Sequence, residues 1–538
     1  MRLSRRLFLA SAAAGLAAPA VLRAQAPLRL TILHTNDVHS RHEPINRFGT
    51  ACRAEEAAPG TCFGGSARLA AALAAERSAA ERDGRTVLVL DAGDQFMGSL
   101  FYTHWRGLAE LEVMNAIGYD AMAVGNHEFD NGPPVFGRFA RGARFAILSA
   151  NIDAAAEPEL AGRIAPFVVL ERGGRKVALV GLTTEDAPRI SSPGPRVRFL
   201  AEAESLATAV RSAREQGASA AIALTHVGLR RDVELARTVS GLSAIVGGHS
   251  HTLLSNTAAG ATGRYPLAEQ GASGFAVPIV QAGANNRYYG RLDLDLDGDG
   301  RVLEARGDAR ELGFADPRDP AVEAIVARLA EPLTALRARV IGSTTEALSN
   351  ALCRRTECAI GNLIAEAMLE AGRPAGAEIA LQNGGGIRAG FPSGAVTWGD
   401  LLTVLPFSNT LATLKLRGAD IRAALENGLS AFEQGAGRFP QVAGLRFTWR
   451  PGAPAGSRLA AVTVRRLDGS YAPLEDDRVY SVVTNNFLRQ GGDAYTVLRD
   501  RAIDPYDTGP NLEEVMEAFF ARRSPLAPLL DGRIAEVP

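Results

Sequence analysis

Seven side chains of the types that bind metal ions lie in five short polar segments of the N-terminal half. Each segment follows an apolar run that reads as a buried strand. Because the carboxyl ends of strands in an α/β sheet meet at one edge, side chains far apart in the sequence would converge there. Mixed oxygen and imidazole ligands suit zinc, manganese, iron or cobalt. The candidates are Asp37, His39, Asp94, Asn126, His226, His249 and His251.

The spacing of these residues points to two ions rather than one. Asp37 and His39 are two positions apart, so in an extended segment both side chains would face the same side. The same argument applies to His249 and His251. Asp94 lies alone in its segment and could bridge the two ions. Two ions about 3.5–4 Å apart can clamp a phosphate group, so the pattern favours phosphoester chemistry. A single histidine would more often be a core or turn residue, and only the ordered combination carries the inference.

Apolar runs and helical patterns alternate through the N-terminal half. The runs end in Asp, Gly, Asn or His, and amphipathic or alanine-rich patterns lie between several of them. This alternation predicts a layered α/β domain. The predicted strands are 29–34, 86–90, 121–124, 145–149, 176–182, 220–224 and 244–246, and the predicted helices are 66–82, 107–117 and 202–216.

A long helical pattern divides the chain. Pro and Asp at 316–320 are typical of a boundary, and Ala, Val and Leu then recur at helical spacing. We interpret 27–315 as the first domain, 316–340 as a linker helix and 341–538 as a second α/β domain with its own glycine-rich loops.

The first 26 residues, 1–26, resemble an export signal. A twin-arginine pair precedes an alanine-rich apolar run that ends in a small-x-small cleavage pattern. This is similar to a Tat signal, so we expect the Tat export machinery to deliver the mature chain to the periplasm or the exterior. An uncleaved anchor helix is the alternative, but the run is short and interrupted by Gly and Pro. No other segment is apolar enough to act as a stable membrane anchor.

Four cysteines form two local pairs, Cys52 with Cys62 and Cys353 with Cys358. An exported protein meets an oxidising compartment, where such pairs close into disulfides. A zinc site made by all four is the alternative, but the pairs are far apart and lack a Cys-x-x-Cys spacing. The net charge of −1 makes no case for a nucleic-acid polymer or a bilayer surface as partner.

The order of the polar segments resembles that of the calcineurin-like metallophosphoesterases. Asp-x-His, Gly-Asp, Gly-Asn-His-Glu, His and Gly-His-x-His follow one another, and 33–39 is similar to the 5′-nucleotidase branch. The resemblance implies a four-layer β-sandwich flanked by helices, a separate α/β substrate-binding domain and two divalent ions, zinc, manganese or similar. Asp37, His39, Asp94 and His251 would bind the first ion, and Asp94, Asn126, His226 and His249 the second.

The resemblance gives His127 a role other than metal binding. This histidine would lie near the phosphate, as a charge stabiliser or as the proton donor to the leaving group. Asp130 would orient its ring and favour the charged form. A hydroxide held between the ions would attack phosphorus. The remaining histidines fit no segment, and we interpret His34 as strand packing and His42 and His104 as surface residues.

The second domain carries residues that the resemblance assigns to a nucleotide. The segment 383–388 resembles the family's phosphate-contacting loop, in which glycine amides approach an anion and arginine offers a fork of donors. Phe407 and Phe487 match two rings that sandwich the base, and Asp493 matches a carboxylate that accepts hydrogen bonds from the ribose. The implied substrate residues are Arg354, Asn383, Arg388, Phe407, Asn409, Phe487 and Asp493.

These features favour an exported 5′-nucleotidase that hydrolyses nucleotides to nucleoside and phosphate. A 2′,3′-cyclic-nucleotide phosphodiesterase or a nucleotide-sugar hydrolase of the same family stays open, because the motifs barely discriminate among them. A Tat-exported thiosulfohydrolase would share the metal domain but would not need the two base-stacking rings. A nucleotide-binding protein without activity is disfavoured, because every expected ligand and His127 are present.

Overall fold

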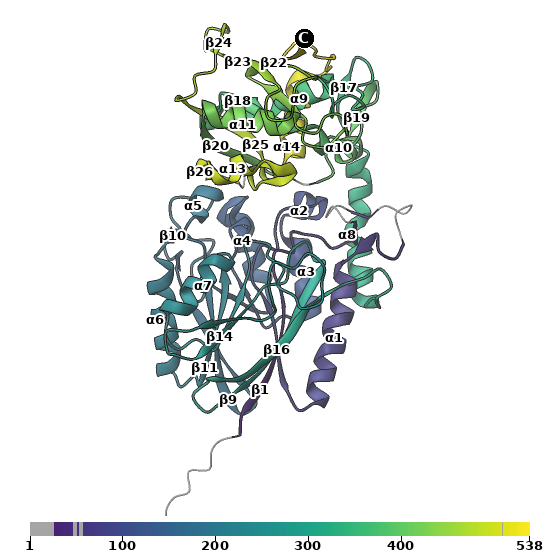
Figure 1. The fold of residues 1–538 in the computed structure, drawn as a ribbon. Coiled ribbons are helices and arrows are strands. Elements are labelled where there is room, and N and C mark those ends of the chain that lie inside the picture. The colour runs from purple at the N-terminus through teal and green to yellow at the C-terminus, as the bar shows by residue number, and fades with distance from the viewer. Residues whose placement is uncertain (1–25, 47–50, 53–57, 408, 508) are drawn as a thin grey trace, which may run out of the picture.

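Two mixed α/β domains joined by a long helix make up the described part of the chain (Figure 1). The computed structural model describes residues 26–46, 51–52, 58–407, 409–507 and 509–538, so the predicted leader lies outside the described residues except for Ala26. The mixed α/β architecture of two domains is confirmed. No helix of the described residues has the length and apolarity needed to cross a membrane.

Two six-stranded sheets face each other in the N-terminal domain. The seven strands that the apolar runs predict are present, to within two residues at each end, and the other five strands were not predicted. The first sheet has the order β16 (Val302–Glu311), β15 (Tyr288–Leu296), β1 (Leu28–Thr35), β4 (Thr86–Asp91), β5 (Ala121–Ala123) and β6 (Ala146–Leu148). The second has the order β13 (Leu267–Gln270), β14 (Ala276–Val280), β12 (Ala244–Gly247), β11 (Ala220–His226), β9 (Arg175–Thr183) and β8 (Phe167–Arg172).

Alternate side chains of the strands build the four layers. Ile32 of β1 packs between the sheets, whereas its neighbour Leu33 packs under the helices outside the first sheet. Leu224 of β11 likewise faces the space between the sheets, while Ala223 faces the outer helices of the second. The first sheet is covered by α1 (Ser66–Arg82), α3 (Leu108–Ile117) and α4 (Gly132–Gly142), and the second by α6 (Glu202–Glu215) and α7 (Leu229–Thr238).

The carboxyl ends of the parallel strands meet at one edge. β1, β4 and β5 run parallel to one another in the first sheet, and β9, β11 and β12 do so in the second. The chain enters β1 at the end remote from the C-terminal domain, so this edge points toward that domain (Figure 1). All five polar segments singled out from the sequence therefore lie at the side of the first domain that faces the second.

The linker helix α8 (Pro320–Arg337) is attached to the first domain along its length. Asp319 caps it by accepting the amides of Ala321 and Val322, both at 2.9 Å. Its apolar residues pack with those of α1 and α3, and Trp105 donates its indole N–H to the Leu329 carbonyl at 2.9 Å. The helix ends three residues before the predicted 340, because Val340 already begins the next strand.

The second domain is organised around a five-stranded sheet with α9 (Ala359–Gly372) and α14 (Leu512–Arg523) on one face and α11 (Gly418–Leu429) on the other. A four-stranded sheet packs beside α11. The five strands are, in order, β21 (Pro440–Ala443), β18 (Ile379–Asn383), β25 (Val479–Asn485), β20 (Leu411–Arg417) and β26 (Ile503–Tyr506). The four are β24 (Tyr471–Pro473), β23 (Leu459–Arg465), β22 (Leu445–Trp449) and β27 (Ile534–Glu536).

Candidate metal centre and substrate region

Two groups of potential ligands lie at the edge where the strands end. Asp37, His39 and His251 form the first group, and their ligand atoms all lie within 4.8 Å of one another. The ring nitrogens Nε2 of His39 and His251 are 2.9 Å apart, and Asp37 Oδ1 is 3.3 Å from His251 Nε2. Atoms that bind a common ion at about 2.0–2.1 Å stand about 3 Å apart, so these separations fit one ion.

The second group consists of Asp94, His226 and His249, whose ligand atoms lie within the same 4.8 Å limit. His226 Nε2 is 3.0 Å from Asp94 Oδ2. The main-chain amide of His249 donates to both oxygens of Asp37, at 3.1 and 3.0 Å, so the two groups are neighbours. The structure thus brings the candidate carboxylates and imidazoles together in two sets.

Asn126 is the one predicted ligand outside these groups, and its surroundings fit a metal ion. The side chain is fully buried, and neither its amide nitrogen nor its oxygen has a hydrogen-bond partner among the described residues. The next amide, of His127, donates to Asp94 Oδ1 at 3.0 Å, which places Asn126 beside that carboxylate. A buried amide without a partner is costly, and a bound cation would satisfy its oxygen.

The backbone of the ligand loops differs from the extended form that we expected for Asp37-x-His39. The backbone of these residues lies in the left-handed region of φ and ψ, which residues other than glycine seldom occupy. Such backbone strain is typical of functional sites. The paired side chains converge because of these turns rather than through strand alternation. The left-handed ligands are Asp37 (φ 51°), His39 (φ 50°), Asp94 (φ 58°), His249 (φ 77°) and His251 (φ 51°).

The electrostatics of the site favour a cation. Burial raises the pKa of the Asp37 carboxyl, but attraction and a hydrogen bond to His251, together with attraction to His226, hold the pKa below its usual value. Burial lowers the pKa of His39 to about 3 and that of His249 to about 4, so both rings are neutral, as ligands must be. Burial also disfavours charge on His226, yet Asp94 raises its pKa to about 10. His226 Nε2 and Asp94 Oδ2, 3.0 Å apart, are close enough to bind a shared cation.

His127 and Asp130 form a dyad beside the ligand groups. His127 Nδ1 is 2.6 Å from Asp130 Oδ2. Burial disfavours the charged ring, but Asp130 and Asp94 together raise the pKa of His127 to about 9. Ser191 donates its hydroxyl to the other oxygen of Asp130, at 2.9 Å. Sequence reasoning missed Ser191, because nothing in its local pattern marks it.

Glu128 fixes the loops that carry the ligands. Its buried carboxylate accepts the amides of Gln95 at 2.9 Å, Asp94 at 3.1 Å and Gly125 at 2.7 Å. One side chain therefore ties the loop after β4 to the loop after β5. The sequence did hold a signal, because Glu128 completes the Gly-Asn-His-Glu segment, but its role as a support required the fold.

Gln281, the residue after β14, supports the Gly-His-x-His segment in the same way. Its amide oxygen accepts from the Ser250 hydroxyl at 2.9 Å and from the Thr252 amide at 2.6 Å. Its amide nitrogen donates to the Gly248 carbonyl at 2.8 Å. The fully buried Gln281 side chain thus holds both sides of His249 and His251. No spacing in the sequence pointed to this residue.

The remaining histidines separate into two buried and one exposed. His34 is buried in β1 and lies 2.9 Å from the Tyr265 hydroxyl, as expected for strand packing, and His104 is exposed. The surface interpretation of His42 is wrong. His42 is 2 % exposed. Its Nδ1 lies 2.9 Å from the Ser66 hydroxyl and its Nε2 lies 3.4 Å from the Glu110 carboxylate. Glu110 comes from α3, so only tertiary packing reveals this pair.

The substrate residues predicted in the second domain gather on neighbouring loops. Asn383 donates to the Asp493 carboxylate at 2.8 Å, and the Arg388 guanidinium lies 5.9 Å from the centre of the Phe407 ring. Phe487 is 45 % exposed, as a ring that stacks on a ligand should be. Asn409 precedes β20 and accepts the Leu512 amide at 2.9 Å through its main-chain carbonyl.

Two of the three glycine amides that we expected to face an anion are bonded within the domain. Gly384 donates to the Phe439 carbonyl and Gly385 to the Gly437 carbonyl, both at 2.8 Å. Glycine is needed for packing instead: a Cβ on Gly384 would stand 2.0 Å from the Cys353 carbonyl oxygen. The predicted anion contact in this segment is the Arg388 side chain rather than these amides.

Both cysteine pairs are joined in the structure, Cys52 to Cys62 and Cys353 to Cys358. Arg354 is half-buried inside the short loop closed by the second disulfide. The Gln441 side chain donates to the Cys353 carbonyl at 2.9 Å and accepts the Cys358 amide at 3.1 Å, so it links β21 to this loop. Arg354 is therefore carried by a braced loop beside the glycine-rich segment.

Comparison with known proteins assigns the family. The model of calcineurin-like phosphoesterases matches residues 30–253, and that of the 5′-nucleotidase C-terminal domain matches 340–500. A 5′-nucleotidase of Diplobatis ommata is 35 % identical over 531 residues, which cover 95 % of this chain and 90 % of that protein. This chain belongs to the 5′-nucleotidase family. It is accordingly a metal-dependent phosphoester hydrolase.

Solved structures of similar proteins extend over nearly the whole chain. A 5′-nucleotidase precursor from Thermus thermophilus is 40 % identical, covers 95 % of this chain and 99 % of its own, and has a TM-score of 0.62. The NAD nucleotidase of Haemophilus influenzae is 25 % identical, covers 95 % and 100 %, and has a TM-score of 0.78. The 5′-nucleotidase fold therefore includes both domains and the linker helix.

Proposed function

We propose that this protein is a dinuclear-metal 5′-nucleotidase that hydrolyses nucleotides to nucleoside and phosphate outside the cytoplasm. The observation that carries the proposal is the pair of ligand groups at one sheet edge, with a fully buried and unsatisfied Asn126 beside them. The exposed Phe487 and the Asp493–Asn383 pair in the second domain support a nucleotide as the substrate.

Two divalent ions, when bound, would supply Lewis acidity and lower the pKa of coordinated water. In this proposal Asp94 would be a ligand of both ions. Asp37, His39 and His251 complete the first set, and Asn126, His226 and His249 complete the second. Glu128 and Gln281 hold the ligand loops, so the geometry exists before substrate arrives.

His127 donates a proton from Nε2 to the leaving oxygen of the substrate. Asp130 and Asp94 favour the charged ring, which is the form that can donate. Asp130 bonds to Nδ1 and so leaves Nε2 free to face the metal edge; Nε2 lies 3.9 Å from Asp94 Oδ2. Ser191 keeps Asp130 in place.

The second domain selects the substrate. Arg354 and Arg388 contact the phosphate as forks of donors, and Asn383 holds the Asp493 carboxylate for the ribose hydroxyls. Phe407 and Phe487 stack on the base, which gives loose base specificity because every base offers a π-face. Asn409 completes this set at the start of β20. Residues 27–315, 316–340 and 341–538 thus divide into catalysis, linkage and recognition.

Export is part of the proposal. Two disulfides suit an oxidising compartment, and the Tat-like segment 1–26 precedes the first strand. The periplasm or the exterior would then supply the nucleotides and the metal ions.

A substrate panel tests the function. Metal-loaded protein should release phosphate from AMP, and the rate should fall when the metals are chelated. The panel should add ATP, 2′,3′-cyclic nucleotides, NAD and UDP-glucose, with thiosulfate-derived sulfate release as the control for the thiosulfohydrolase alternative. Turnover of a cyclic nucleotide or nucleotide sugar far above that of AMP would replace the proposed substrate, and activity only in the sulfate assay would remove it.

A further inference from the structure

A buried polar cluster lies behind the loop after β1, residues 36–44, which carries two ligands of the first set. At its centre is Glu110 of α3, which is fully buried. Glu110 accepts the Ser40 hydroxyl, and His42 Nε2 lies 3.4 Å from the same carboxylate oxygen. His42 Nδ1 is 2.9 Å from the hydroxyl of Ser66, the first residue of α1. The cluster thus ties this loop to two helices.

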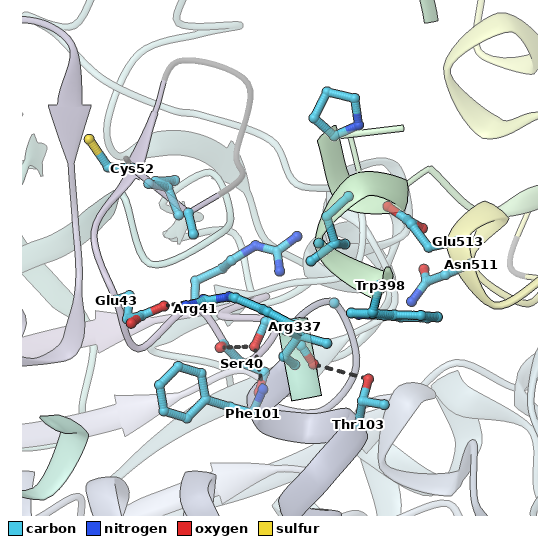
Figure 2. Close-up of a pocket in the computed structure, with 18 of the residues that line it drawn as sticks. Ser40, Arg41, Glu43, Cys52, Phe101, Thr103, Arg337, Trp398, Asn511 and Glu513 are labelled. Atoms are coloured by element: carbon cyan, nitrogen blue, oxygen red, sulfur yellow. Dashed lines mark hydrogen bonds and ion pairs between the residues drawn. The ribbon is translucent and has the colours of Figure 1, made fainter. Parts of the chain in front are cut away.

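The other side of the loop faces a cavity. Residues 40–44 line a space of about 710 Å³ between the two domains. Figure 2 shows Ser40 and Phe101 on the metal-domain side of this cavity and Glu513 on the opposite side. Open space cannot hold a backbone in place, so the loop depends on the protein behind it, where Glu110 lies.

The loop needs this support because its backbone is strained next to a ligand. His39 and Ser40 have φ values of 50° and 59°, and residues other than glycine keep such values only where their surroundings fix them. The Ser40 amide donates to the Gln95 carbonyl at 2.8 Å, and its carbonyl accepts the Ser99 hydroxyl at 2.6 Å. Both partners belong to the loop after β4. The hydroxyl of Ser40 reaches Glu110, so only this third contact ties Ser40 to α3.

His39 transmits the support to the first ligand set. Its Nδ1 lies 3.2 Å from the Phe96 carbonyl, and a proton on Nδ1 can donate to this carbonyl while Nε2 stays available for an ion. His39 Nε2 is 2.9 Å from His251 Nε2. The direction of the His39 ring follows from the backbone turn at 39–40, so a shift of Ser40 would move Nε2 away from the other ligands.

The second ligand set is held by other side chains. Gln281 holds the segment with His249, and Glu128 accepts the amides of Asp94 and Gln95. The Gln95 carbonyl in turn accepts the Ser40 amide, so Glu128 supports the loops of both sets. The Glu110 carboxylate, by contrast, contacts the loop of the first set.

We propose that Glu110 is a positioning residue for the first metal ion, because through Ser40 it sets the direction of the His39 ring. The inference rests on the proposed function, since it assumes two ions. Its signature is a loss of affinity at one of the two metal sites. A carboxylate that merely stabilised the domain would affect both sites alike.

Zinc binding to chelated protein, measured by equilibrium dialysis, tests the proposal. Glu110→Met keeps the length of the side chain but removes the acceptor of the Ser40 hydroxyl. It should raise the dissociation constant of one zinc equivalent about 10–100-fold and change that of the other less than about threefold. Glu110→Gln keeps an oxygen acceptor and should recover most of the affinity. Glu112→Met is the matched control: Glu112 lies on the same helix but pairs with Arg328, so both equivalents should bind as in wild type.

Variants with a single metal site identify the weakened ion. His39→Ala should retain only the second ion, and adding Glu110→Met should not weaken that ion further. His249→Ala should retain only the first ion, and adding Glu110→Met should weaken it about 10–100-fold. The reverse pattern would contradict the assignment to the first ion.

Kinetics give a second readout. At limiting zinc, Glu110→Met should release phosphate from AMP slowly, and excess zinc should restore kcat while KM for AMP stays unchanged. Thermal unfolding of the chelated protein shows whether the variant is folded. If it is not, Ser40→Ala replaces it, because this change removes only the hydroxyl and should weaken the same zinc equivalent.

Two results would overturn the proposal: zinc binding by the folded variant that equals wild type, or equal weakening of both equivalents. If wild type meanwhile binds two zinc ions and releases phosphate from AMP, the proposed function stands without the role of Glu110. Wild-type protein that binds fewer than two zinc ions would overturn both.

Discussion

The metal edge of the first domain and the glycine-rich loop of the second present their chemistry in different ways. At the metal edge, candidate ligands follow strands of two facing sheets, and left-handed turns braced by Glu128 complete the approach that leaves Asp94 Oδ2 3.0 Å from His226 Nε2. In the second domain Gly384 serves packing, and the amides of Gly384 and Gly385 bond to the carbonyls of Phe439 and Gly437. Chemistry placed at strand ends can therefore be read from order and spacing, whereas chemistry placed on packed loops cannot.

The largest effect is expected from a change at Asp94, the residue that both proposed ions would share. Asp94→Asn keeps the size of the side chain but removes the charge that faces His226 and His127. Phosphate release from AMP should fall about 10³-fold or more, with fewer than two metal equivalents retained. Metal analysis with a phosphate-release assay measures both quantities. Wild-type metal content and turnover in this variant would show that Asp94 is not a bridge.

His127→Ala should separate chemistry from metal binding. The ring lies in neither ligand group, so metal content should stay at the wild-type level. Turnover should fall by about 10²–10⁴-fold, because the proton donor is lost. Steady-state kinetics and metal analysis on one preparation are sufficient. Loss of metal in proportion to activity would make His127 a ligand instead.

Glu128→Gln tests whether the hydrogen bonds of this side chain hold the ligand loops in place. The amide nitrogen of Gln cannot accept a hydrogen bond, so at least one of the amides of Asp94, Gln95 and Gly125 loses its acceptor. We expect metal affinity to fall by about 10–100-fold with the fold retained. Titration of chelated protein with zinc or manganese measures the change. Unaltered affinity would show that the loops hold their shape without this carboxylate.

The smallest effect is expected for Phe487→Ala, in the second domain. The exposed ring should add stacking energy only, so KM for AMP should rise about tenfold while kcat changes little. Phe407→Ala should behave alike if the two rings form a pair. Phe275→Ala, an exposed ring remote from both sites, is the control. A loss of kcat without a change in KM would remove Phe487 from the base site.

The largest effects are expected at residues that the sequence pattern already marked as ligands. Seven strands of the first domain, the linker helix and the two ligand groups follow from the sequence patterns. What could not be predicted depends on contacts between distant segments. His42 is buried only because Glu110 of α3 lies beside it, and Ser191 reaches Asp130 from the loop after α5 (Ala187–Ile190). The left-handed turns at Asp37 and His39 also lie outside any strand or helix pattern.

The glycine-rich segment shows the limit of a resemblance. Its letters match a phosphate-contacting loop, yet the close approach of Gly384 to Cys353 explains the glycine without any ligand. The arginines stay predicted anion contacts, because that prediction depends on their side chains and not on the packed amides. Only the structure could separate a packing role of the glycines from a ligand contact, because it shows which glycine amides are already bonded.

Metal stoichiometry coupled to activity tests the central claim most directly. Chelated protein should be inactive on AMP and should recover phosphate release as zinc or manganese is added back, with recovery complete at two equivalents per chain. Full activity after chelation, or complete recovery at a single equivalent, would contradict a dinuclear centre at this sheet edge.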